Sequence, residues 1–206
     1  MHLFDNLDSG NGYKIRLLLA QLGQSYEWTN LDLDAGESRT PQFLKRNPNG
    51  RIPTLELDDG TNLAESDAIL FYLAEGSGFL PADRLGRAQM LQWMFFEQYS
   101  HEPFVATPRF IVKHLPPGHA RHAELPDRLA RGRAAFAVME THLAQRRFFV
   151  AERYGIADIA LYAYTHVAHE GGHDLKPYPS VRAWLERVAA QPRHVEITAR
   201  PKSARR

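Results

Sequence analysis

Three short stretches near the N-terminus carry polar residues where the chain turns. The first is "DSGNG" at residues 8–12, in which Ser9 stands just before an apolar segment of helical spacing. The second is "NGRIP", which ends at Pro53, and the third is "ESDAIL", which opens with Glu65 and Ser66. Helix N-termini present unpaired N–H groups that bind anions, and a serine hydroxyl can also donate a hydrogen bond to an anion. These stretches predict a site for a small anionic ligand.

The three stretches suit a ligand with a peptide-like middle and a charged amino-acid end. A cis bond between Ile52 and Pro53 would leave the backbone of Ile52 free to pair with a peptide group. Ser66 and its neighbouring N–H groups can take a carboxylate, and Glu65 can pair with an ammonium group. The reactive part of the ligand would then lie near Ser9. Each piece alone is explained equally well as a cap, an edge proline or a turn, but their occurrence together favours the ligand.

The absence of cysteine limits the chemistry that the 206-residue chain can perform. It excludes disulfides, thiolate metal sites and Cys-x-x-Cys redox pairs, so any thiol must arrive with a ligand. The formal net charge of +1 gives no indication of nucleic-acid binding. No segment approaches the roughly 18 apolar residues of a membrane span, and the N-terminus lacks a signal-peptide pattern. We expect a cytoplasmic protein that binds neither nucleic acid nor membranes.

The first eighty residues alternate between strand and helix patterns. Strands are predicted at residues 2–4 and 26–33, and a hairpin that turns at Asp59-Gly60 is predicted within residues 53–64. Helical spacing and capping residues predict helices at residues 13–23, 41–47 and 64–76. This order is typical of a small α/β domain.

The rest of the chain has a helical pattern nearly throughout. From about Arg84 the apolar residues recur at helical spacing, with interruptions expected at Pro103 and Pro108. No strand pattern is found past residue 80. We therefore predict an α/β domain at residues 1–78, an all-helical domain at 84–197 and a disordered tail at 198–206.

Two longer motifs resemble a known family. "NPNGRIPTLELDDGTNLAESDAILFYLAE" resembles the glutathione-site block of bacterial glutathione S-transferases, and "YGIADIALYAY" resembles the core motif of their helical domain. The resemblance extends from His2 to about Ile197. It implies a thioredoxin-like N-terminal domain, an all-helical C-terminal domain and a homodimer. It also implies a detoxifying transferase that uses glutathione as a co-substrate and has no other cofactor.

The resemblance assigns roles to the residues of the glutathione-site block. Pro53 matches the family's cis-proline, and Ile52 matches the residue whose backbone pairs with the cysteinyl part of glutathione. Glu65 and Ser66 match the pair that holds the γ-glutamyl end. Basic side chains that meet the glycyl carboxylate match two further positions more loosely, Arg39 and Arg51.

Ser9 matches the activating residue of the serine-type classes. Only the thiolate attacks, and a free thiol with a pKa of about 8.5 is mostly protonated near neutral pH. A hydrogen bond from the Ser9 hydroxyl, together with a helix that starts near Gly12, would favour the thiolate. The plain alternative is that Ser9 only caps this helix. Asn11 is a second candidate donor, and Tyr13 is a more distant third.

The implied product is a conjugate between glutathione and an electrophilic, mostly apolar substrate. That substrate is expected between the two domains, against the long helical segment. The candidate lining residues are aromatic or imidazole side chains: Phe96, Tyr99, His101, Phe104, Phe110 and Tyr164.

Other activities fit the same residues. An activated glutathione thiolate could also reduce a disulfide or a peroxide, and serine-type relatives include isomerases of maleyl-type acids. The alternative from another class is a non-catalytic module that binds glutathione and partner proteins.

Two motifs of the helical half are predicted to be structural. "HEGGH" at residues 169–173 matches the H-E-x-x-H zinc pattern, but its two glycines each cost about 1 kcal/mol in a helix, which favours a helix end and no metal. The family's core motif normally opens with Ser or Thr, whereas Gly155 precedes Asp158 here. We expect the helix to form and Asp158 to stabilise it.

Overall fold

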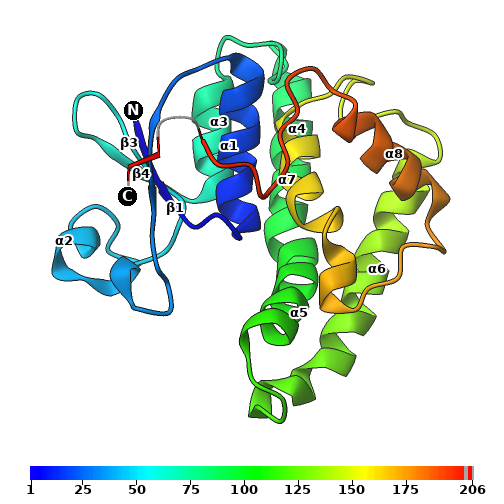
Figure 1. Cartoon of the computed structure of the whole chain (residues 1–206). Helices are drawn as coiled ribbons and strands as arrows, with labels where there is room; N and C mark the ends of the chain where they lie inside the picture. Colours follow the sequence, from blue (N-terminus) through cyan, green and yellow to red (C-terminus); the bar gives the residue numbers. More distant parts are fainter. Residues whose placement is uncertain (202–203, 206) are drawn as a thin grey trace. The chain divides into compact units, whose positions relative to one another are not determined.

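The computed structural model describes residues 1–201 and 204–205 and divides into two units (Figure 1). The N-terminal unit comprises Met1–Glu75 together with Pro192–Arg206, and the helical unit comprises Gly76–Gln191. No helix in the described residues is long and apolar enough to cross a membrane. The observed division lies near the expected boundary. Residues 192–197, however, group with the N-terminal unit and not with the helical domain to which we assigned them.

A mixed sheet with the strand order β4-β3-β1-β2-β5 is the centre of the N-terminal unit. β1 (His2–Asp5) pairs in parallel with β2 (Glu27–Asn30) and antiparallel with β3 (Thr54–Glu56). β3 forms the predicted hairpin with β4 (Asn62–Ala64). The strand regions expected in the first eighty residues are confirmed, and the unit has the predicted thioredoxin-like fold.

The end of the chain differs from the expectation. β5 (Ala204–Arg205) lies parallel to β2, so the predictions of no strand past residue 80 and of a disordered 198–206 tail are wrong there. The edge of β2 offers unpaired backbone groups to any extended segment that reaches it, and a two-residue pairing leaves no periodic signal. Residues 202, 203 and 206 of the predicted tail lie outside the described residues.

Two of the N-terminal helices begin directly after the side chains that cap them. α1 (Gly10–Leu22) starts after Ser9, whose Oγ accepts a hydrogen bond from the Gly12 N–H at 3.2 Å. The one-turn helix α2 (Pro41–Leu44) follows the 3₁₀ turn Glu37–Arg39. Thr40 caps α2, because its Oγ1 accepts a hydrogen bond from the Phe43 N–H at 3.3 Å. These caps fix the loops that precede the helices.

α1 and α3 (Ser66–Ala74) lie side by side and supply the apolar core of the N-terminal unit (Figure 1). Each fully buried aliphatic side chain contributes roughly 1.5–3 kcal/mol. The fully buried core residues of this layer include Leu3, Ile15, Leu18, Leu55, Ile69 and Leu70. This packing holds the N-termini of α1 and α3 in fixed positions.

The helical unit contains five α-helices in its described residues. They are α4 (Arg84–Phe96), α5 (Glu102–His114), α6 (Leu125–Leu143), α7 (Ile156–Thr165) and α8 (Pro179–Ala189). A π-helical turn at Glu97–His101 joins α4 to α5, and 3₁₀ turns lie at Ala120–Glu124 and Ala168–Gly171. The all-helical prediction is confirmed. The interruption expected at Pro108 is wrong, because α5 continues through this proline.

Asp158 stabilises the start of α7 from a fully buried position. Its carboxylate accepts hydrogen bonds from the N–H groups of Gly155 and Phe149 and from the indole of Trp184, at 3.0, 3.2 and 2.9 Å. A side chain at position 155 would meet Met90 Cε and the Phe79 carbonyl, each at 2.8 Å from an ideal Cβ. Glycine is therefore required here, and the structural reading of Asp158 agrees with its contacts.

Burial raises the pKa of Asp158 from 3.8 to about 7. A carboxyl group whose folded pKa lies above its unfolded value adds stability that is fully present below the unfolded pKa and is lost as the pH rises through the folded pKa. Asp158→Asn cannot ionise. We therefore expect the difference in unfolding free energy, wild type minus variant, to fall by a few kcal/mol between about pH 4 and pH 8.

Urea denaturation at several pH values measures this difference, and Asp127→Asn on the surface of α6 is the matched control. A difference that grows with pH would mean that the fold prefers the ionised carboxylate.

Candidate functional site

The sheet register brings the three predicted stretches to one end of the N-terminal unit. Phe4 of β1 pairs with Thr54 of β3, and Thr54 pairs with Ala64 of β4. β1 therefore ends where β3 begins and where β4 ends. The segments next to these paired residues carry Ser9, Ile52, Pro53, Glu65 and Ser66.

A hydrogen-bonded chain connects the first and third stretches. Ser66 is only 5% exposed, and its hydroxyl donates to Asn11 Oδ1 at 3.2 Å and accepts from Lys14 Nζ at 3.2 Å. Lys14 also pairs with Asp67 at 3.2 Å. The N-termini of α1 and α3 are thus joined through side chains.

Ser9 is both the cap of α1 and a candidate donor. Its oxygen accepts from the Gly12 N–H, and among the described residues its hydroxyl hydrogen has no acceptor. A hydroxyl can accept and donate at once, so the capping role does not prevent donation to a ligand. The side chain is half-buried.

The second stretch has the predicted backbone. The Ile52–Pro53 bond is cis, and no partner for the backbone N–H or C=O of Ile52 is found within the described residues. Buried Asn47 stabilises the loop, because its Nδ2 donates to the Arg51 carbonyl at 2.8 Å and to Thr54 Oγ1 at 3.2 Å.

Glu65 has a backbone conformation that is uncommon for a residue with a side chain. Its φ is 66°, and its exposed side chain precedes the first turn of α3. Such residues cost about 1–3 kcal/mol and cluster at binding sites. The two basic candidates, Arg39 and Arg51, are exposed, and Arg39 donates to the Asn49 carbonyl at 2.9 Å.

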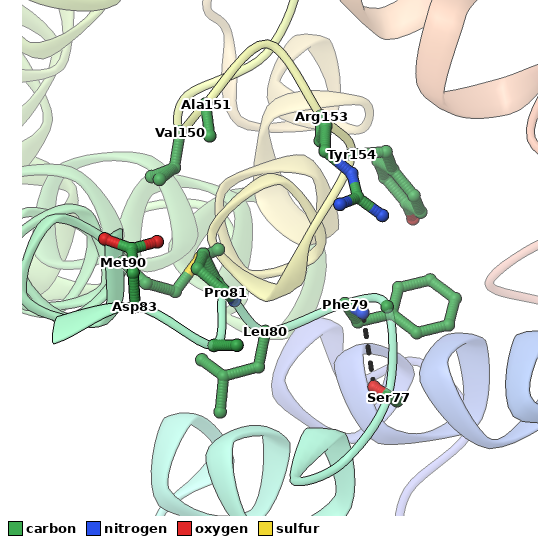
Figure 2. Close-up of a pocket in the computed structure, with 12 residues that line it drawn as sticks. Ser77, Phe79, Leu80, Pro81, Asp83, Met90, Val150, Ala151, Arg153 and Tyr154 are labelled. Carbon is green, nitrogen blue, oxygen red and sulfur yellow. Dashed lines mark hydrogen bonds between the residues drawn. The ribbon is translucent and has the colours of Figure 1, made fainter. Parts of the chain in front are cut away.

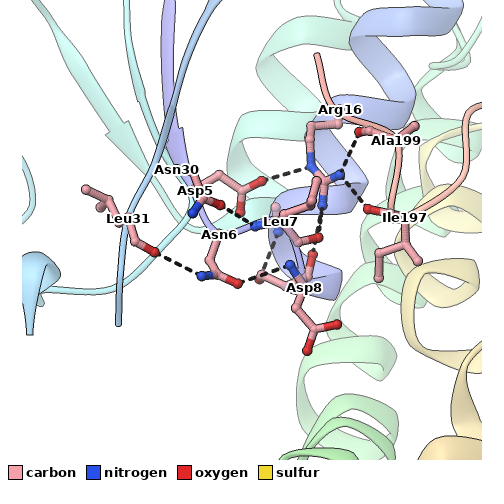
Figure 3. Close-up of polar contacts among 11 residues, drawn as sticks. Asp5, Asn6, Leu7, Asp8, Arg16, Asn30, Leu31, Ile197 and Ala199 are labelled. Carbon is pink, nitrogen blue, oxygen red and sulfur yellow. Dashed lines mark hydrogen bonds and ion pairs between the residues drawn. The ribbon is translucent and has the colours of Figure 1, made fainter. Parts of the chain in front are cut away.

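A buried ion pair holds the first stretch in place (Figure 3). Arg16 Nε lies 2.9 Å from Asp5 Oδ2, and both side chains are essentially inaccessible. The same guanidinium donates to the Leu7 carbonyl at 2.7 Å and to the Ile197 carbonyl at 2.7 Å. Burial raises the pKa of Asp5 to about 6, although Arg16 opposes the shift.

The aromatic candidates of the helical unit fall into two groups. Phe96, Tyr99 and Phe104 line a groove of about 610 Å³ together with Arg131 and Val138. The other three candidates do not line it. His101 is fully buried and contacts Thr165, Tyr164 is 9% exposed, and Phe110 stacks on His114. Helical spacing alone does not distinguish a core face from a groove, and this groove contains three of the six predicted residues.

A second hollow in the helical unit has a volume of about 410 Å³ (Figure 2). Its apolar wall includes Phe79, Leu80, Pro81 and Met90, and the guanidinium of Arg153 lies on the opposite side. None of the predicted site residues lines it.

The H-E-x-x-H pattern has a structural explanation. Pro108 has no N–H, so the Phe104 carbonyl lacks its usual helical partner, and His173 Nε2 donates to that carbonyl at 2.9 Å. Glu170 pairs with Arg109 and Lys113 at 2.8 and 3.0 Å. Gly172 ends the 3₁₀ turn with a φ of 91°, as the helix-end prediction requires. No group of three or more potential metal ligands occurs in the described residues.

Two family models match the chain and agree with its two units. Residues 1–75 match the N-terminal domain of glutathione S-transferases, and residues 122–187 match their C-terminal domain. The chain belongs to the glutathione S-transferase family.

Individual relatives are similar over nearly the whole chain. A glutathione S-transferase structure from Pseudomonas fluorescens has 51% identity and a TM-score of 0.94, covering 96% of this chain and 98% of that one. The disulfide-bond oxidoreductase YfcG of Escherichia coli is 32% identical over 88% of this chain and 87% of its own. A glutathione transferase from Burkholderia graminis, with two glutathione molecules bound per subunit, has 28% identity and a TM-score of 0.84, covering 98% and 88%.

Length differs in one group of relatives. Protein URE2 of Eremothecium gossypii is 29% identical over 92% of this chain, but the chain spans only 65% of its length.

Two features of the site were missed by the sequence reasoning. Lys14 and Arg16 looked like ordinary helical residues, although both are buried beneath the site. The available signal was their position in the sequence. Lys14 precedes Ile15 and Arg16 follows it, and the next three residues of α1 are all leucines. A cation on a buried face requires an acceptor, so this position predicts a polar partner.

We expect His173→Ala to lower the free energy of unfolding by about 1–3 kcal/mol, because the Phe104 carbonyl loses its donor. In the Pro108→Ala background the new N–H can pair with this carbonyl. The loss should then be smaller by about 1 kcal/mol.

A double-mutant cycle by urea denaturation tests this coupling, with exposed His114→Ala as the control. Equal losses in both backgrounds would show that His173 acts through packing alone.

Proposed function

We propose that the chain binds glutathione at the sheet end that carries Ser9, Ile52 and Ser66, and that Ser9 stabilises the thiolate. The observation that supports this proposal most directly is that the sheet register brings the three stretches to the same end of the N-terminal unit. In this assignment Glu65 and Ser66 hold the γ-glutamyl end and the Ile52 backbone pairs with the cysteinyl part. Arg39 and Arg51 lie on the side of the glycyl carboxylate. Relatives that bind glutathione support the assignment.

The proposed reaction begins with loss of the thiol proton to solvent. The sulfur lone pair then forms a carbon–sulfur bond with an electrophile, and the electron pair of the bond that breaks leaves with the displaced group. Ser9 donates a hydrogen bond to the sulfur and is not itself a nucleophile. A decrease of two units in the thiol pKa corresponds to about 2.7 kcal/mol.

The groove of Phe96, Tyr99 and Phe104 is our proposed site for the apolar co-substrate. Its aromatic lining suits a flat, mostly apolar molecule. His101, Tyr164 and Phe110 lie outside this groove. We also propose a homodimer, supported by the exposed Phe95 of the helical unit, at 69% exposure. The proposed location is cytoplasmic. Measurement of the molar mass in solution tests the dimer.

A second candidate reaction is glutathione-dependent disulfide reduction. The chain has no cysteine, so both thiols would have to come from ligands. One glutathione thiolate attacks a disulfide, forms a mixed disulfide and releases the first substrate thiolate. A second glutathione thiolate attacks the glutathione sulfur of the mixed disulfide, which gives oxidised glutathione and releases the second substrate thiolate. The E. coli oxidoreductase and the relative with two bound glutathione molecules favour this alternative.

We expect bound glutathione to ionise about two pKa units below the free thiol, and Ser9→Ala to remove most of this shift. Thiolate absorbance followed against pH measures both values. Ser9→Gly is the matched variant, because glycine costs only a few tenths of a kcal/mol at a helix cap but lacks the hydroxyl. Ser9→Thr keeps the hydroxyl and should keep the shift.

A full shift in Ser9→Ala and Ser9→Gly, with loss of the shift in Asn11→Ala, would transfer the role to Asn11. Binding with an ordinary thiol pKa would reduce the protein to a glutathione-binding module.

Turnover measurements distinguish the two reactions. We expect glutathione consumption with an aryl halide to release halide in equal amount, whereas disulfide reduction consumes two glutathione molecules per disulfide. If the wild type turns over only a small disulfide such as hydroxyethyl disulfide, the second candidate replaces the first.

A further inference from the structure

Lys14 is the only lysine among the fully buried side chains of the described residues. Its side chain is 0% exposed, and it is the fifth residue of α1 after the Ser9 cap. Burying an ammonium group costs several kcal/mol unless it is paired and hydrogen-bonded. Leucine or methionine would fill the same space at no such cost. The charge therefore requires an explanation beyond packing.

The hydrogen-bond partners of Lys14 explain why a charged side chain is buried here. Nζ donates to Ser66 Oγ at 3.2 Å and to Asp67 Oδ1 at 3.2 Å. An ammonium group has only donors, so the Ser66 oxygen must act as the acceptor in the first contact. The single hydroxyl hydrogen of Ser66 is then directed to Asn11 Oδ1, 3.2 Å away.

The hydrogen bond from Ser66 also determines the orientation of the Asn11 amide. Because Ser66 donates, the side-chain oxygen of Asn11 must face Ser66, and the Nδ2 group is at the opposite end of the amide. One lysine thus sets the direction of two further hydrogen-bonding groups. Both groups belong to the proposed glutathione site, one at its γ-glutamyl end and one in the thiolate loop.

We propose that Lys14 is a positioning residue that couples recognition of the γ-glutamyl end to activation of the thiol, through the chain Lys14–Ser66–Asn11. The inference rests on the proposed function. Removal of the lysine frees the Ser66 hydroxyl to rotate, and Asn11 loses its fixed donor. Both ends of the site then weaken together.

The test compares wild type with Lys14→Met, which has similar length and no charge. We expect the Kd for glutathione to rise about tenfold. The thiol pKa of bound glutathione should rise by about half a unit, because Asn11 is the second donor beside Ser9. Cysteinylglycine lacks the γ-glutamyl group, so its Kd should change much less. A merely structural role would lower stability and leave both the thiol pKa and the ratio of the two Kd values unchanged.

Ser66→Ala tests the path of the effect. In this background the chain is already broken, so Lys14→Met should produce no further rise in the thiol pKa. An equal rise in both backgrounds would show that the charge acts through space and would overturn the proposed chain.

Asp67→Asn keeps the proposal testable if Lys14→Met does not fold. This variant leaves the Ser66–Asn11 contact intact and removes a negative charge, so the thiol pKa should stay the same or fall. A rise would contradict the proposal. The wild type is measured first: an unshifted thiol there refutes the proposed function, whereas a shifted thiol that Lys14→Met leaves unchanged refutes only the role of Lys14.

Discussion

The guanidinium group of Arg16 joins four separate pieces of the N-terminal unit. It pairs with Asp5 at the end of β1, donates to the Leu7 carbonyl in the following loop, and donates to the Ile197 carbonyl in the C-terminal segment, while its own backbone belongs to α1. Arginine suits this task because its donors are fixed in one plane and cannot be lost by deprotonation. Loss of one partner of such a buried pair typically costs 3–5 kcal/mol, a large share of the roughly 5–15 kcal/mol that stabilises a domain.

The same ion pair restricts the residue type at position 12, in the first turn of α1 after Ser9. An ideal Cβ at position 12 would lie only 1.5 Å from Asp5 Oδ1, so Asp5 and any side chain at this position cannot both fit. Glycine allows the first turn of α1 to approach Asp5, and the backbone N–H of the same residue donates to Ser9 Oγ at 3.2 Å. Gly12 therefore contacts both groups: its lack of a side chain leaves room for Asp5, and its backbone N–H holds the oxygen of the candidate donor.

The local parts of this arrangement could be predicted, and the long-range parts could not. Ser9, Thr40 and the Asp59-Gly60 turn act within four residues of themselves, so their types and spacing indicate the caps and the hairpin. The Lys14 contacts span 52 and 53 residues and the contact of Arg16 with Ile197 spans 181, and helical periodicity carries no information about partners so far along the chain. β5 and the contact between His173 and Phe104 were missed for the same reason. The resemblance to the family supplied the roles of Ile52 and Glu65, which periodicity alone left open.

In the proposed reaction a protein without cysteine contributes only binding and electrostatics to the thiol chemistry, and the magnitudes indicate which group contributes most. A two-unit decrease in the thiol pKa requires about 2.7 kcal/mol. The N-terminus of α1 supplies roughly 0.3–1 kcal/mol at a partly exposed position, which is too little by itself. One hydrogen bond to a charged acceptor adds about 1.5–3 kcal/mol, so a single well-placed hydroxyl accounts for most of the remainder. The energetic requirement is therefore for one donor held at the correct place, and the buried contacts of Arg16 and Lys14 hold the two candidates, Ser9 and Asn11, in position.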